Sequence, residues 1–192
     1  MGSIVTLGFS FENSNNNLNF FIELLLQKLN YIDEILIDHL ENESWKKEFF
    51  KLLSKEKLNW ILTTQNFKIK FKAKINDNIL NVFIDKECLE HSFAIIINFN
   101  EEELLASFDN IFLRTNLFLD NFVTEIFQSY SFKYAFCDNN ALYEYEILEF
   151  CYKAYKNFSI SYIPFESKLK IIRQNWEIDG CTNRKPQIKL IK

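Results

Sequence analysis

Glycine, proline and histidine are scarce in this 192-residue chain, which has three glycines, two prolines and two histidines. Three scattered glycines cannot form a phosphate-binding P-loop or a dinucleotide-binding fingerprint, because both motifs need closely spaced glycines near a helix start. Two histidines, His39 and His91, nearly exclude a histidine-based metal site. Turns must therefore rely on other residues, chiefly the 22 asparagines, which tolerate left-handed backbone angles.

The four cysteines are also few and widely spaced, at positions 88, 137, 151 and 181. Their separations fit neither a paired-cysteine zinc site nor a dense disulfide scaffold. We expect buried thiols in a reducing cytoplasm. Carboxylates lie beside Cys88 and Cys137 in the sequence, and nearby negative charge raises a thiol pKa, which disfavours a cysteine nucleophile.

The chain lacks a basic leader followed by an apolar segment, and no apolar run approaches the ~20 residues that span a bilayer. We therefore expect a cytoplasmic protein that does not enter the membrane. Nearly half of the residues are apolar and a quarter are charged, which excludes disorder for the chain as a whole. The length fits one domain, residues 1–192, and no proline-rich linker or repeat divides it.

Apolar periodicity predicts an alternation of strands and helices. Helices are predicted from Leu18 to Leu29, over a short segment capped by Ser44 with Trp45, Phe49, Leu52 and Leu53 on one face, and from Leu104 to Phe127 with a break near residues 114–116. Asn100 is placed to cap the last of these. Strands are predicted at 3–11, 31–40, 59–64, 67–75, 79–85, 93–99, 132–138, 160–163, 168–173 and 187–191. Of these, 31–40 also fits a helix, and we favour the strand. This order predicts a single α+β domain with a mixed or mostly antiparallel sheet and helices packed on one face.

The stretch NFKIKFKAKIND places Lys68, Lys70, Lys72 and Lys74 on one side of a predicted strand. These lysines could contact phosphates of a nucleic acid. The net charge of −4 argues against a nucleic-acid partner, since such proteins are usually basic. We interpret the lysines as a solvated strand face that guards an exposed strand against edge-to-edge pairing.

Asp138, Glu166 and Lys168 loosely match a metal-dependent nuclease motif, in which carboxylates hold a divalent ion and a lysine stabilises developing charge. This combination is common by chance in charged proteins. We expect a protein with no catalytic residues, no cofactor and no metal, and we keep the metal-dependent nuclease as an alternative.

Charge is segregated along the chain: residues 100–149 hold ten acids against two basic residues, whereas residues 150–192 hold nine basic residues against three acids. The acids gather at one predicted helix start. An acidic surface steers association with a basic partner. The candidate partner-binding residues are Glu101, Glu102, Glu103, Asp109, Asp138 and Asn139.

The opening MGSIVTLGFSF, the lysine hairpin and the stretch KYAFCDNNALYEYE together resemble the small immunity proteins of bacterial polymorphic toxin systems. The resemblance implies a cytoplasmic, single-domain α+β protein that binds and neutralises a toxin encoded next door, without catalysis. It carries over no functional positions. The first alternative is a phage-encoded inhibitor of a bacterial defence enzyme, and the metal-dependent nuclease is the second.

Overall fold

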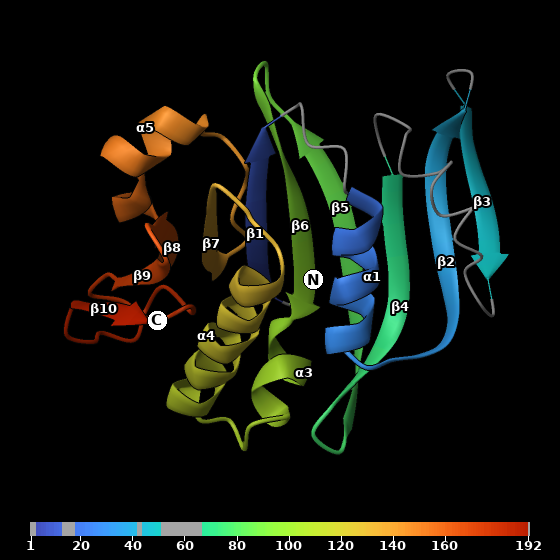
Figure 1. Cartoon of the computed structure of the whole chain (residues 1–192). Helices are drawn as coiled ribbons and strands as arrows, with labels where there is room; N and C mark the ends of the chain where they lie inside the picture. The colour runs from blue at the N-terminus through green and yellow to red at the C-terminus, as the bar shows by residue number, and fades with distance from the viewer. Residues whose placement is uncertain (1–2, 13–17, 42–43, 51–66, 192) are drawn as a thin grey trace.

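The computed structural model describes residues 3–12, 18–41, 44–50 and 67–191, and its described strands all join one sheet (Figure 1). The ten strands follow the order β10-β9-β8-β7-β1-β6-β5-β4-β2-β3, and every neighbouring pair is antiparallel. This confirms the predicted α+β class and antiparallel sheet. The strands are β1 (Ile4–Glu12), β2 (Tyr31–Glu41), β3 (Ser44–Phe50), β4 (Phe67–Ile75), β5 (Asn78–Cys88), β6 (Ser92–Asn100), β7 (Tyr134–Asn139), β8 (Ile160–Phe165), β9 (Lys168–Arg173) and β10 (Gln187–Ile191).

Helices α1, α3 and α4 lie in front of the sheet in Figure 1, and their apolar side chains share the main core with one face of it. The helices are α1 (Leu18–Lys28), α3 (Glu101–Ala106), α4 (Phe112–Ser129) and α5 (Ile147–Tyr152), with a 3-10 turn η1 (Ala154–Asn157). In β1, alternate residues such as Leu7 and Phe9 point into this core. These three helices pack on one face, as predicted.

A second, smaller core lies on the opposite face of the sheet. Tyr134 and Phe136 of β7 are out of phase with the main-core residues Ala135 and Cys137, so they point the other way. Phe150 of α5 stacks on Tyr134 with ring centroids 3.7 Å apart. The prediction of helices on one face did not include this second layer, whose helix α5 is only six residues long.

The short helix predicted from Ser44 is wrong, because that segment is strand β3. It pairs with β2 in the register Leu36↔Phe49 and Asp38↔Lys47. A short isolated helix is marginal, whereas pairing with β2 satisfies the backbone groups of both strands. The strand predicted at 59–64 and the positions of Leu52 and Leu53 lie outside the described residues.

The helix break predicted near residues 114–116 is also wrong, because the chain turns between α3 and α4 at residues 107–111. Asp109 and Asn110 both adopt φ near +57°, a left-handed conformation that Asp and Asn reach more easily than most residues. The amide N–H of Asn110 donates to the Leu105 carbonyl at 2.8 Å and closes α3. The predicted cap is confirmed, since the Asn100 side chain accepts from the Glu103 N–H.

In the part of the chain that the structure describes, no helix combines the length and the apolar character that crossing a membrane requires.

Candidate functional site

Two of the predicted partner-binding residues, Glu101 and Asn139, meet at the sheet end where β6 and β7 finish. The Asn139 amide lies 3.5 Å from Glu101 Oε2, and Ser3 Oγ donates to Asn139 Oδ1 at 2.6 Å. Glu103 faces inward, because its carboxylate accepts from the backbone N–H and the side-chain amide of Asn81. It therefore ties α3 to β5.

The remaining two acids of the predicted acidic group, Glu102 and Asp109, are exposed to solvent. Asp109 forms an exposed ion pair with Arg114 at the start of α4. Of the acids at this helix start, Glu102 and Asp109 are thus the ones most open to a partner.

Asp138 is a structural anchor. Its carboxylate accepts from the N–H groups of Asn139 and Ser159, each at 2.8 Å, and from the Trp176 indole at 3.3 Å. Burial raises the pKa of Asp138, and these hydrogen bonds oppose the rise. The side chain holds β7, β8 and the C-terminal segment together.

The proposed nuclease residues are not brought together. Asp138 bonds to Ser159, which precedes β8, whereas Glu166 is exposed in the turn after the other end of that strand. At ~3.3 Å per residue, the six residues of β8 separate them by roughly 20 Å, too far for one shared metal ion.

Burial raises the pKa of the Cys137 thiol well above its usual range, with the Asp138 charge adding to the effect. Cys137 is buried as predicted, but the prediction is wrong for the other three thiols, which are exposed.

The lysine face lies on an interior strand. β4 sits between β2 and β5, and its four lysines alternate as exposed residues with buried apolar ones. The solvated strand face is therefore confirmed, but the role of guarding a sheet edge is wrong. Lys70 Nζ lies 5.1 Å from the centre of the Phe83 ring, and Lys68 Nζ lies 3.8 Å from Asp85 Oδ1.

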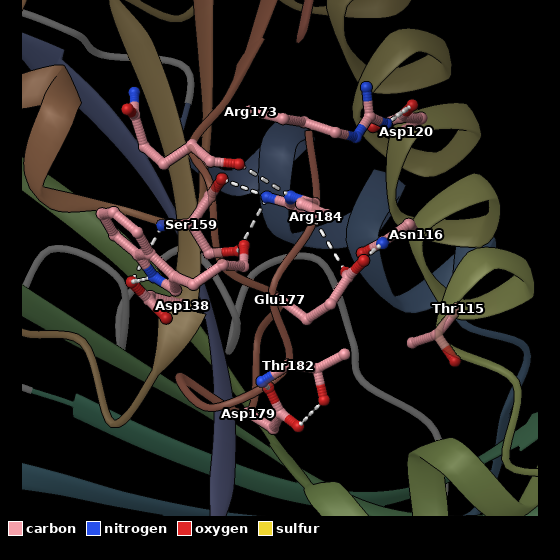
Figure 2. Close-up of polar contacts among 12 residues, drawn as sticks. Thr115, Asn116, Asp120, Asp138, Ser159, Arg173, Glu177, Asp179, Thr182 and Arg184 are labelled. Atoms are coloured by element: carbon pink, nitrogen blue, oxygen red, sulfur yellow. Dashed lines mark hydrogen bonds and ion pairs between the residues drawn. The ribbon is translucent and has the colours of Figure 1, made fainter. Parts of the chain in front are cut away.

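The structure has a cleft between α4 and the C-terminal strands that the sequence did not predict. Figure 2 shows polar residues that line it and their contacts. At its base, Asp120 of α4 forms a buried ion pair with Arg173 of β9. The Tyr162 hydroxyl donates to Asp120 Oδ1 at 3.2 Å. Burial, together with the Asp120 charge, raises the pKa of Tyr162, so this phenol stays protonated and keeps donating.

Arg184, in the loop between β9 and β10, lines the cleft on the side opposite α4. It donates to Glu177 Oε2 at 2.9 Å, to the Gln174 carbonyl at 3.0 Å and to both oxygens of Ser159 (Figure 2). Burial lowers the pKa of Arg184, and the Glu177 charge opposes that shift. The guanidinium fork thereby fixes the loop between β9 and β10 against β8.

Asn116 completes the cleft from α4 and is only 4% exposed. Its Nδ2 donates to Glu177 Oε2 at 2.8 Å. Among the described residues its Oδ1 has no hydrogen-bond partner. The cleft encloses about 210 Å³ and is lined by Leu113, Asn116, Leu117, Asp120, Arg173, Glu177, Arg184, Gln187 and Lys189.

A sequence signal for this site existed. In the sequence, Asn116 and Asp120 are polar residues four apart in a segment rich in apolar residues, which places them on one side of a helix. The structure shows that both are buried. Buried polar groups require partners. The partners, Arg173 and Glu177, are more than 50 positions away, so the sequence did not identify them.

The described residues thus form an α+β protein whose buried polar groups hold elements in place around an open cleft. The chain belongs to the Immunity protein 64 family, whose family model matches residues 1–184. This confirms the resemblance to immunity proteins, a class that neutralises toxins. Comparison with curated proteins and with solved structures finds no match.

Proposed function

We propose that this chain neutralises a cognate toxin by binding it stoichiometrically in the cytoplasm, without catalysing a reaction. The observation that carries the proposal is the family match over residues 1–184. The geometry disfavours the nuclease alternative, because Asp138 is engaged in hydrogen bonds that hold the fold and Glu166 lies far from it.

The partner in this proposal is a basic protein whose active site or substrate surface is covered in the complex. Glu102 and Asp109 are the exposed acids at the start of α3 and in the turn before α4. Such exposed charges accelerate encounter with an oppositely charged protein. The other candidates lie beside these acids: Asn139 contacts Glu101, Asp138 accepts from the Asn139 N–H, and Glu103 joins α3 to β5.

An inhibitor of a bacterial defence enzyme, encoded by a phage, would use the same binding physics. The family match favours the toxin as target. The two are separated by which protein is bound: the product of the gene next to this one, or a host enzyme.

The test is co-expression of this chain with the product of the adjacent gene. We expect cells that make the neighbouring gene's product to survive only when this chain is made as well, and the two proteins to co-elute as a 1:1 complex. A toxic neighbour that kills despite abundant, folded immunity protein would overturn the proposal.

A charge test follows from the complex. The variant Glu102→Gln/Asp109→Asn should slow association at low salt, because it removes charges that steer encounter. The matched control, Glu144→Gln/Glu166→Gln, removes the same net charge from other exposed positions. Equal slowing by both variants would place the contact elsewhere.

A further inference from the structure

Two exposed leucines stand at the mouth of the cleft between α4 and the C-terminal strands. Leu113 is 69% exposed and Leu117 is 48% exposed, and both line the cleft. Because they are four positions apart on α4, they are neighbours on one side of the helix. This apolar strip borders a polar cleft, an arrangement typical of the buried centre of a protein interface.

Asn116, which lines the cleft, carries an acceptor for which the described residues supply no donor. Asn116 Oδ1 is buried without a hydrogen-bond partner among the described residues. Turning the amide over would aim its oxygen at the Glu177 carboxylate, so the bond from Nδ2 to Glu177 fixes the orientation. A buried acceptor without a partner is unfavourable, and a donor from outside would relieve that cost.

The charges of the cleft select a neutral donor. Asp120 is paired with Arg173, and Glu177 with Arg184. A lysine or arginine entering the cleft would meet these two guanidinium groups and Lys189, whereas an anion would bring no hydrogen for the Asn116 carbonyl to accept. A neutral N–H or O–H group avoids the excess positive charge and still supplies a donor.

The size of the cleft narrows the choice further. Its 210 Å³ would hold roughly seven waters at ~30 Å³ each, which is room for one large side chain. Tyr and Trp combine an apolar body with a neutral donor, and they are the residues most enriched among interface anchors.

Building on the function proposed above, we infer that this cleft receives a Tyr or Trp side chain of the toxin. The O–H or N–H of that side chain donates to Asn116 Oδ1, and Leu113 and Leu117 pack around the ring. The cleft is thus a specificity pocket of the toxin-binding surface.

The first experiment uses the toxin identified by the co-expression test and measures its Kd by calorimetry. The variant Leu113→Gln/Leu117→Gln keeps helix propensity and should weaken binding by about 30-fold or more, as loss of an interface anchor does. The control Ile79→Gln/Leu142→Gln removes two equally large exposed apolar side chains elsewhere and should change Kd by less than ~3-fold.

The second experiment is a double-mutant cycle between the two proteins. Each Tyr or Trp of the toxin is changed to Phe and tested against wild-type immunity protein and Asn116→Leu. For one of these aromatic residues, the change to Phe should weaken binding to the wild-type immunity protein. The same change should weaken binding to Asn116→Leu much less, and this difference demonstrates coupling between the two side chains. If Asn116→Leu does not fold, Leu117→Trp replaces it, since the larger side chain fills the cleft mouth and should abolish the effect of the same toxin substitution.

Three outcomes overturn the inference. In the first, Leu113→Gln/Leu117→Gln and its control bind the toxin equally well. In the second, no aromatic residue of the toxin couples to Asn116, although the wild-type complex forms normally. Alternatively, the free protein self-associates with increasing concentration and Leu113→Gln/Leu117→Gln abolishes this, which would make a second copy the occupant. In these cases the proposed function stands. A wild-type protein that binds no toxin instead overturns the proposed function, and the inference with it.

Discussion

Asp120 of α4 and Arg173 of β9 form an ion pair in which both side chains are largely buried. The pair links the long helix to the C-terminal part of the sheet, 53 positions further along the chain. Because the same two residues line the cleft, its shape depends on this contact.

Arg173→Met should therefore destabilise the protein strongly. The Asp120 carboxylate would stay buried with only the Tyr162 hydroxyl as partner, and breaking a buried pair from one side costs about 3–5 kcal/mol. The matched control is Lys28→Met, which removes the exposed pair between Lys28 Nζ and Glu125 Oε2 and should cost at most about 1 kcal/mol. Urea unfolding of both variants measures the difference, and similar costs would show that the Asp120–Arg173 pair is not a buried anchor.

Gly8→Ala should destabilise β1 by overpacking. An added Cβ would lie 2.5 Å from Phe136 Cε1 and 3.0 Å from Ile96 Cδ1, and Phe136 is itself packed against Phe158. Overpacking of this kind costs about 1–3 kcal/mol. In chemical denaturation, the double variant Gly8→Ala/Phe136→Leu should cost less than the sum of its two single changes, because Leu removes the clashing ring atoms. Simple additivity would contradict the expected clash.

Asp138 should give the protein a measurable pH dependence. Burial raises its pKa in the folded state above the ~3.9 of an unfolded chain, so the folded state binds the proton more tightly. Its contribution to stability is then present below about pH 3.9 and is lost as the pH rises through the folded-state pKa. Asp138→Asn does not titrate, so the stability of wild type relative to this variant should fall across that window and stay flat above it. Unfolding curves from pH 3.5 to 8 test this, and a relative stability that grows with pH would show that the hydrogen bonds outweigh burial.

Lys189 and Lys70 should differ in their effect on self-association. Lys189 lies on β10, an edge of the described sheet, between the exposed side chains of Ile188 and Leu190. Lys70 lies on the interior strand β4. Charged residues on an edge strand oppose pairing with another chain, so Lys189→Thr should increase aggregation in light scattering while Lys70→Thr should not. Equal behaviour of the two variants would show that β10 is not an accessible edge.

Much of the local structure could be predicted from the sequence, because it depends on side chains close together in the chain. The alternation of lysine with apolar residues in β4, the continuous apolar run of β6 and the Asn100 cap are examples. Periods of two residues and of 3.6 residues report directly which side of an element is buried. The α+β class followed from the order of these elements.

The position of each element was decided only by tertiary structure. Segment 44–50 became a strand because the neighbouring strand β2 offered it backbone partners, and β4 became an interior strand because β2 pairs along its far side. The candidate site shows the same dependence. Asp138 and Glu103 turned toward backbone N–H groups of other elements, and the cleft formed where Asn116 and Asp120 met Glu177 and Arg173. The sequence determined which residues are apolar, polar or charged, whereas long-range strand pairing and the need to pair buried polar groups decided which of them meet.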